Sequence, residues 1–469
     1  MNKKPFIISF LILLVFSSPT IALGASVSVG HELNLFDSHS QRIPSEIDYT
    51  FIWEDYVGAP GLIYGDDALV WGSSFGPYHN YSEQTTKLQS LETAFPDIID
   101  LFSIGKTYFG RDIHCVRITD ESVTQTKSEI LIVAQHHARE QITVENALYF
   151  IDKIVNDSLD PSSGISGLLQ RKAIYVIPSL NIDGAELMSQ FPWQRKTARP
   201  IDEDGDGTAD ELEASDIDND GYIECLYQNF GDNSNPDWRV VGYEGIDLDG
   251  DGKTGEDLPG GVDPNRNYPF QFGNQSGASA DPNSEVYHGI KAFSENCTAR
   301  LRDFVLQRNF VTAVSLHSGT TAVLAPWAWS NKLPTGEDGE RYNTTGYQLQ
   351  TLTGLSFEYL YPSTGEWGDW MYGRDNSTTK LAFTLETYGN EEAIQGYYNE
   401  TTSTWHERGI WDMFNPQANL VIYNCHSVYK GLLFLVEYEE PSFTPGFQFW
   451  IFIPVIAFFI ACTILRKRK

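Results

Sequence analysis

The sequence predicts an α/β fold in which a mixed, mostly parallel twisted sheet is flanked by helices. Four short apolar runs rich in β-branched residues have the length of buried strands. They lie at 130–134, 174–177, 311–316 and 381–385. A helical periodicity follows the first run, with one apolar face formed by Val144, Leu148, Ile151 and Val155. Strands that alternate with helices favour a largely parallel sheet covered on both sides.

Polar side chains follow each of the four predicted strands. These residues are His137 and Glu140, then Asn181 and Asp183, then His317, and finally Glu386. In open α/β sheets, ligands bind beyond the carboxyl ends of the strands, where the loops converge. The sequence therefore predicts a functional site at this edge of the sheet.

His137, Glu140 and His317 form a candidate metal site. His137 and Glu140 are three residues apart at a strand-to-helix turn, a spacing that lets both side chains face one point. Two histidines and one glutamate leave the fourth position of a tetrahedral Zn²⁺ open for water, as a catalytic site requires. His136 is the competing ligand, but it would give an H-x-x-x-E spacing, so we favour His137.

Seven motifs in a fixed order resemble the zinc carboxypeptidases of the carboxypeptidase A/B type. They are residues 105–111 (GKTYFGR), 137–140 (HARE), 178–184 (PSLNIDG), 195–196 (RK), 261–268 (GVDPNRNY), 315–318 (SLHS) and 383–386 (FTLE). The resemblance covers about residues 81–438 and implies a carboxypeptidase-like catalytic domain that removes single residues from peptide C-termini. It also implies one catalytic Zn²⁺ held by the His-Glu-His set.

The resemblance assigns the catalytic and substrate-binding roles. Glu386 is similar to the family's general base, and Arg195 to the arginine that stabilises the tetrahedral intermediate. A free C-terminal carboxylate distinguishes a chain end from an interior bond, and a guanidinium suits its recognition. The remaining residues that the resemblance places around the substrate are Asn265 and Arg266 at the carboxylate, Tyr361 over the substrate and Arg139 at the neighbouring subsite.

Gly368 occupies the position that sets side-chain preference in the family. This position is acidic in members that take Lys or Arg and apolar in members that take hydrophobic ends. Glycine fits neither group, so we expect a roomy pocket for large apolar or mixed residues.

An acidic insertion at 202–257 carries 19 Asp and Glu against Arg239 and Lys253. Three D-x-D-x-D-G patterns within it resemble the start of calcium-binding loops. The predicted calcium ligands are Asp202, Asp204, Asp206, Thr208, Asp210 and Glu213; Asp216, Asp218, Asp220 and Glu224; and Asp247, Asp249 and Asp251. Tyr227 stands at the twelfth position of the second loop, so that loop is not a complete EF-hand site. The alternative is a solvated acidic linker.

Both ends of the sequence indicate export and membrane anchoring. Residues 1–24 have the layout of a signal peptide. Residues 447–465 are apolar enough for a transmembrane helix, and a basic tail follows at 466–469. We therefore expect an extracellular catalytic domain at 81–438 and a linker at 439–446, while 25–80 has no assigned role. Seven N-x-S/T sequons are compatible with a glycoprotein.

The composition argues against one class of partner, nucleic acid, and leaves more than one function open. The net charge of −31 argues against nucleic acid, whose phosphates need clustered Lys and Arg. Four cysteines lie outside the membrane segment, an even number that permits disulfides, but their spacing assigns no pairs; they are Cys115, Cys225, Cys297 and Cys425.

The leading hypothesis is a peptidase acting on free C-termini. The alternatives are a zinc amidase or endopeptidase on cell-wall or branched acidic peptides, and an inactive calcium-binding surface protein.

Overall fold

The computed structural model describes most of the chain between Tyr78 and Glu439. The described residues are 78–188, 191–201, 209, 215–217, 223–229, 238–245, 260–274, 276–401 and 403–439. The predicted signal peptide, the segment 25–77, most of the calcium-loop residues and the predicted transmembrane helix lie outside these ranges, so those expectations stay predictions. Among the residues that the structure describes, no helix has both the length and the apolar character that a membrane crossing requires.

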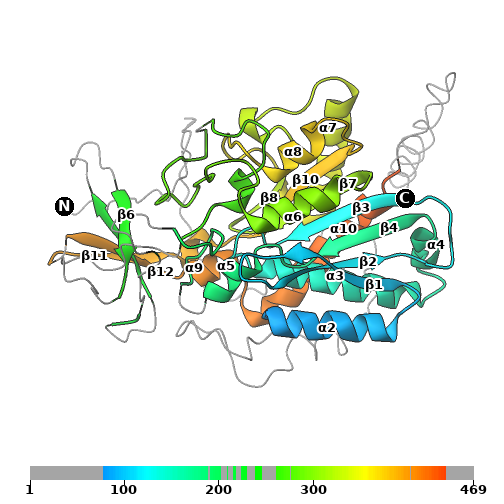
Figure 1. The fold of residues 1–469 in the computed structure, drawn as a ribbon, viewed down its shortest axis with the longest axis horizontal. Helices are drawn as coiled ribbons and strands as arrows, with labels where there is room; N and C mark the ends of the chain where they lie inside the picture. The colour runs from blue at the N-terminus through cyan, green and yellow to red at the C-terminus, as the bar shows by residue number, and fades with distance from the viewer. Residues whose placement is uncertain are drawn as a thin grey trace, which may run out of the picture. The chain divides into compact units, whose positions relative to one another are not determined.

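An eight-stranded mixed sheet forms the centre of the fold (Figure 1). Its strands, in spatial order, are β1 (Ile99–Lys106), β2 (Asp112–Ile118), β4 (Lys172–Ile177), β3 (Ser128–Ala134), β7 (Phe310–His317), β10 (Leu381–Tyr388), β8 (Thr320–Leu324) and β9 (Ser356–Phe357). The four central strands β4, β3, β7 and β10 run parallel, and antiparallel pairs flank them on both sides. The four apolar runs predicted from the sequence are these four central strands.

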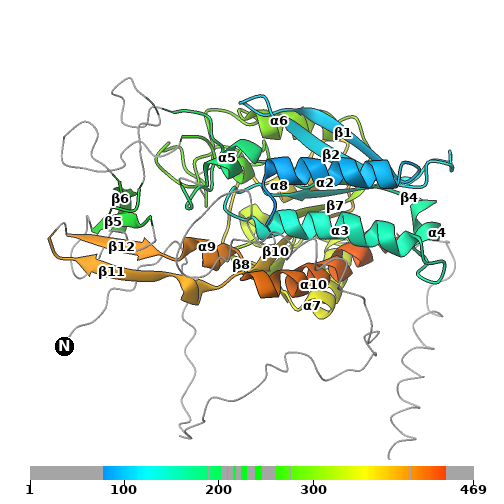
Figure 2. The ribbon, with the colours of Figure 1, turned by 90° about the horizontal axis from the view of Figure 1, so that it is seen from below.

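Helices cover both faces of the sheet, as the alternation of strands and helices predicts (Figure 2). One face carries Leu131 and Val133 of β3, which belong to one apolar core with residues of α6 (Asn296–Val305) and α8 (Trp367–Gly373). Ile130 and Ile132 alternate to the other face, which α3 (Ile142–Ser158) and α10 (Ala418–Glu437) cover. Helix α3 contains the predicted periodic face and is buried around most of its surface.

The described part of the chain contains five further helices and three short 3₁₀ turns. They are α2 (Tyr81–Ala94), α4 (Ile165–Leu169), α5 (Ile182–Leu187), α7 (Glu337–Thr353) and α9 (Ile410–Phe414), with the short 3₁₀ turns η1 (Pro264–Arg266), η2 (Ala328–Ser330) and η3 (Glu391–Ala393). Helix α2 begins with a capping box, in which the Asn80 side chain accepts from the Glu83 N–H and the Glu83 carboxylate accepts from the Asn80 N–H.

A second, four-stranded antiparallel sheet is formed by two distant segments. Its order is β11 (Gln395–Asn399), β12 (Thr404–Arg408), β5 (Cys225–Asn229) and β6 (Trp238–Tyr243). Strands β5 and β6 come from the acidic insertion, and β11 and β12 form a hairpin after β10. A small core of Phe191, Trp193, Cys225, Tyr243, Ile410 and Phe414 joins this sheet to α9 (Figure 1). The sequence analysis did not predict these strands.

The four cysteines Cys115, Cys225, Cys297 and Cys425 are all buried free thiols in the structure. Burial raises the pKa of each thiol above its ordinary value. Their even number therefore does not correspond to disulfide pairs here, and each acts as a small apolar side chain in the interior.

Candidate active site

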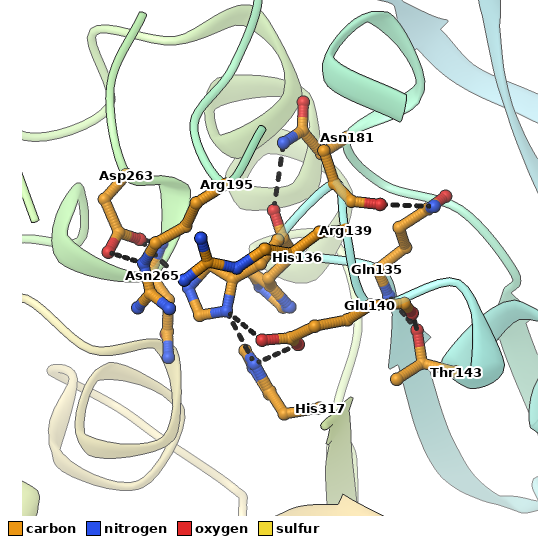
Figure 3. Close-up of polar contacts among 12 residues, drawn as sticks. Gln135, His136, Arg139, Glu140, Thr143, Asn181, Arg195, Asp263, Asn265 and His317 are labelled. Carbon is orange, nitrogen blue, oxygen red and sulfur yellow. Dashed lines mark hydrogen bonds and ion pairs between the residues drawn. The ribbon is translucent and has the colours of Figure 1, made fainter. Parts of the chain in front are cut away.

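The site begins at the turn between β3 and α3. Gln135 follows the last residue of β3 and adopts a positive φ of 54°, which turns the chain away from the strand direction. The Gln135 side-chain amide donates to the Ala138 carbonyl at 3.1 Å, and its backbone N–H donates to the Thr143 hydroxyl at 3.0 Å. This closed turn holds His137 and Glu140 at the carboxyl end of β3, and Figure 3 shows Gln135, Glu140 and Thr143 of this turn.

Three side chains converge at one point beyond the strand ends. His137 Nδ1 lies 2.7 Å from Glu140 Oε1 and 3.2 Å from His317 Nδ1, and His317 Nδ1 lies 3.0 Å from Glu140 Oε2. All three side chains are buried. Figure 3 shows Glu140 and His317 directed toward one another. The structure thus brings together the three residues that the sequence predicts as metal ligands.

His136, the competing ligand, points elsewhere. Its Nδ1 lies 2.9 Å from the Ser315 hydroxyl and its Nε2 lies 3.0 Å from the Tyr268 hydroxyl. Both ring nitrogens therefore have hydrogen-bond partners in the core, and the geometry favours His137 as the ligand.

The donor set fits a zinc ion. Tetrahedral bonds of about 2.0–2.1 Å place neighbouring ligand atoms about 3.3 Å apart, close to the separation of the two imidazole nitrogens. Burial opposes ionisation of Glu140, but His137 and His317 hold the pKa of its carboxyl far below the ordinary value, so the site keeps an anion. On the other side of its ring, His137 Nε2 lies 3.1 Å from Asp263 Oδ1, a carboxylate that orients the imidazole.

Glu386 lies next to this donor set on the neighbouring strand. It pairs in register with His317 across the parallel strands β10 and β7, so both side chains project from the same face of the sheet. Burial, and after it the charge of Glu140, raise the pKa of Glu386 well above its ordinary value. A carboxylate with a raised pKa is suited to accept and return a proton near neutral pH.

Arg195 reaches the site through a short backbone pairing. The Ala138 N–H donates to the Arg195 carbonyl at 3.2 Å, which fixes the arginine beside the metal-site turn. Arg195 Nε donates to Asp263 Oδ2 at 3.0 Å, and the Asp263 side chain is fully buried. Although burial opposes the charge of Arg195, Asp263 raises the pKa of its guanidinium above the ordinary value. Asp263 therefore connects Arg195 to His137; Figure 3 shows Asp263 beside Arg195.

Arg266 forms a second buried cation beside the site. Its Nε donates to the Gly277 carbonyl at 2.6 Å, and one NH1 bond goes to the Asn265 carbonyl at 2.8 Å. Its NH2 lies 3.3 Å from the Tyr361 hydroxyl, which belongs to a partly exposed side chain. Asn265 Oδ1 accepts from the Trp367 N–H at 3.0 Å, so this amide secures the start of α8. Arg266 therefore contacts both Asn265 and Tyr361, two of the other residues that the resemblance places around the substrate.

Arg139 is buried and bound by other groups of the protein. Its NH1 and NH2 contact the Glu285 carboxylate at 2.8 and 3.2 Å, and NH1 also donates to the Trp193 carbonyl. Its guanidinium lies 4.5 Å from the centre of the Phe414 ring. The Glu285 side chain, by contrast, is 44% exposed. At this subsite the structure presents an acidic group beside the predicted arginine.

Gly368 lies in α8 with open space in front of it. A Cβ atom at this position would meet one heavy atom within 4 Å, the Thr384 hydroxyl oxygen at 3.7 Å. Thr384 lies two residues before Glu386 on the same face of β10, so Gly368 borders the space beside the candidate base.

Of the predicted calcium ligands, the structure describes Asp216 and Glu224. The Glu224 carboxylate lies 2.6 Å from His406 Nδ1 and accepts from the Tyr397 hydroxyl at 3.0 Å, within the smaller sheet. In this structure its partners are therefore β-sheet side chains. The other predicted calcium ligands lie outside the described residues.

Asn181 and Asp183, which also follow a strand, hold loops in place. Asn181 Nδ2 donates to the His136 and Lys196 carbonyls at 3.1 and 3.0 Å. Asp183 accepts from the Thr107 hydroxyl and from Arg111. They support the site from outside the metal donor set.

Sequence reasoning missed the roles of Asp263, Glu285 and Glu366. Asp263 lies inside a motif that carries the resemblance, but only the structure shows that it contacts both His137 and Arg195. Glu285 and Glu366 lie in irregular or helix-capping segments, and no spacing in the sequence places them against Arg139 and Arg266.

Three protein donors around one point leave a fourth position for water or substrate, the arrangement of catalytic rather than structural zinc sites. The fold and the site thus define a single-metal centre at the carboxyl ends of parallel strands. A family model described as zinc carboxypeptidase (Peptidase_M14) matches residues 85–408. The chain belongs to the zinc carboxypeptidase family.

Known proteins of this family resemble the chain over most of its described length. Carboxypeptidase A4 of Mus musculus is 27% identical over 324 residues, which cover 67% of this chain and 63% of that protein. Carboxypeptidase B of Astacus astacus is 26% identical over 320 residues, covering 66% and 86%. The match thus spans less than two thirds of the mouse protein. The crystal structure of carboxypeptidase A from Helicoverpa armigera shares the fold, with a TM-score of 0.54 at 18% identity, over 82% of this chain and 78% of that one.

Proposed function

We propose that the chain is a zinc metallocarboxypeptidase that hydrolyses the C-terminal peptide bond of extracellular peptides. The observation that carries this proposal is the buried cation Arg266, which lies with Tyr361 beside a His-Glu-His metal donor set. A buried guanidinium next to a hydrolytic centre gives a reason to bind a substrate carboxylate, and a free α-carboxylate exists only at the C-terminus of a peptide.

Each residue of the site has a distinct task in this proposal. When bound by His137, Glu140 and His317, zinc polarises the scissile carbonyl and lowers the pKa of water. Glu386 accepts the proton of the attacking water and returns it to the departing amine nitrogen. Arg195 donates to the oxygen that gains negative charge in the transition state. Asp263 keeps His137 and Arg195 oriented.

The Arg266 assignment predicts that the enzyme discriminates between a free and an amidated C-terminus. Amidation removes the negative charge of the substrate, so its charge-assisted hydrogen bonds to Arg266 are lost. We expect kcat/KM on the amide to fall by about 10²-fold relative to the free acid. The measurement compares two N-blocked peptides that differ only in this group.

Equal rates on the two peptides would instead support the alternative, an amidase or endopeptidase. The second alternative, an inactive surface protein, predicts no release from either peptide. Retention of the complete donor set together with Glu386 is the observation against it.

We also propose that the acidic insertion binds Ca²⁺. The support is the repeated D-x-D-x-D-G pattern, which alternates carboxylates before a glycine as calcium loops do. Strands β5 and β6 of this insertion pair with each other, β5 also pairs with β12, and the small core of this sheet includes Trp193, two residues before Arg195. Ordering of the insertion is therefore expected to affect the structure around Arg195.

Calcium at millimolar concentration is expected to raise Tm, because a ligand that binds only the folded state stabilises it by mass action. Without a cation, the 19 carboxylates of this segment repel one another. The measurement is a thermal melt of zinc-loaded protein with Ca²⁺, with Mg²⁺ as control, and with a calcium-selective chelator. Identical melting temperatures in all three would leave the insertion a solvated acidic segment.

A further inference from the structure

Glu366 places a carboxylate against the cation that is proposed to bind the substrate C-terminus. Glu366 Oε1 lies 3.2 Å from Arg266 NH1 and also accepts from the Ser363 hydroxyl. The Arg266 side chain is 1% exposed and that of Glu366 is 15% exposed. Within the described part of the chain both contacts use Oε1, which leaves Oε2 for a ligand.

The position of Glu366 is fixed from two sides. It is the N-cap residue of α8, and the next residue, Trp367, donates its N–H to Asn265 Oδ1. Helix α8 packs on β10, the strand that carries Glu386 (Figure 1). The carboxylate is therefore held at the end of a helix whose other contacts are part of the site.

Position 368, two residues after Glu366, is a glycine and therefore adds no charged side chain beside it. Gly368 leaves open space in front of Thr384, two residues before Glu386. Glu366 contacts Arg266, and Gly368, two residues further along the chain, faces Thr384. These contacts place the start of α8 between Arg266 and strand β10.

At Arg266, one guanidinium would face two carboxylates when an ordinary C-terminal residue binds. Glu366 already contacts it, and the bound C-terminus would bring the second carboxylate. Arg195 cannot supply the missing charge because Asp263 pairs with it. A cation on the terminal side chain of the substrate would restore neutrality, and Oε2 of Glu366 is an acceptor for it.

We propose that Glu366 is a specificity-determining residue that selects peptides ending in Lys or Arg. This inference rests on the proposed carboxypeptidase function and replaces the expectation of an apolar or mixed pocket. The charge that selects the substrate belongs to Glu366, the N-cap residue of α8. It lies two residues before Gly368, the position that sets side-chain preference in the family that the sequence resembles.

Two matched substrate pairs test the proposal on the unaltered protein. N-blocked peptides ending in Lys or norleucine, and in Arg or citrulline, differ in charge with little change in shape. We expect kcat/KM to be at least about tenfold higher for the charged member of each pair, since one charge-assisted bond within the site contributes on this scale. Equal or reversed preference would overturn the proposal even if Glu366→Gln failed to fold.

The Glu366→Gln variant then assigns the preference to this side chain. It keeps the size and the hydrogen bond from Ser363 but removes the charge. We expect both preferences to fall to about threefold or less, mainly through slower cleavage of the charged peptides. The kcat/KM on the norleucine peptide should not fall, because Arg266 then faces only the substrate carboxylate. Glu340→Gln removes a charge from the exposed surface of α7 and is the matched control, which should keep both preferences. An unchanged preference in Glu366→Gln would contradict the proposal.

Binding of free amino acids gives a readout apart from turnover. Calorimetric titration with arginine and with citrulline should show tighter binding of arginine to the unaltered protein and no difference for Glu366→Gln. Absence of C-terminal release from all four peptides would refute the proposed function. Release from all four without charge preference would refute only the role of Glu366.

Discussion

The variant Glu386→Gln is expected to lose about 10³–10⁴-fold in kcat, the upper range for removal of a general acid–base group. Glutamine has the same shape but cannot accept the proton of the attacking water. KM should change little, because the group acts on the transition state rather than on bound substrate. The measurement is steady-state kinetics on a cleaved N-blocked peptide, with zinc content determined on the same sample.

Folding and metal binding of this variant should remain intact. Glu386 is not among the three metal donors, and burial together with Glu140 raises the pKa of its carboxyl, so the ionised form is unfavourable in the folded protein. A neutral glutamine therefore should not lower the Tm of the metal-free protein. Glu340→Gln on α7 controls for the loss of one carboxylate. Turnover within tenfold of the unaltered protein, at full zinc occupancy, would exclude Glu386 as the base.

The central sheet could be predicted because its strands are buried on both faces. Such strands are continuous apolar runs, and β3, β4, β7 and β10 all follow that pattern. Because these strands run parallel, the polar residues that follow them lie at the same edge of the sheet. The structure adds the register, in which Glu386 of β10 pairs with His317 of β7.

The smaller sheet could not be predicted, because its stability depends on pairing between distant segments. Strand β11 is almost fully exposed, β12 is polar at four of its five positions, and β5 ends in Gln228 and Asn229, so none of them shows the alternation typical of a half-buried strand. Strand β5 pairs with β12, and Glu224, which directly precedes β5, contacts His406 of β12 across a separation of 182 positions. Local sequence carries no signal for such a pairing.

The supporting carboxylates of the site were missed for a similar reason. Asp263, Glu285 and Glu366 each pair with an arginine distant in sequence. Each pair is decided by the geometry of loops and helix ends, whereas the metal donors follow strands that were predicted from the sequence. For that reason the arginines could be identified from the sequence, but the carboxylates that pair with them could not.

The variant Arg195→Ala is expected to lose about 10²–10³-fold in kcat, the cost of removing one donor to a developing oxyanion. KM should stay within a few-fold, because Arg195 interacts most strongly with the transition state. Arg195→Lys should recover part of the loss, since it restores a charge but not the planar guanidinium that donates to Asp263. Kinetics at saturating zinc separates this effect from any loss of metal.

Loss of Arg195 also leaves the buried Asp263 carboxylate without its cation, which lowers stability by about 3–5 kcal/mol and disturbs the orientation of His137. The double variant Arg195→Ala/Asp263→Asn removes that uncompensated charge. If Arg195 donates to the transition state, the double variant should recover Tm toward the unaltered protein while kcat stays low. If Arg195 only neutralises Asp263, kcat should return together with Tm. Zinc affinity, measured in parallel, reports the contribution of Asp263 to His137, expected at about 10–100-fold.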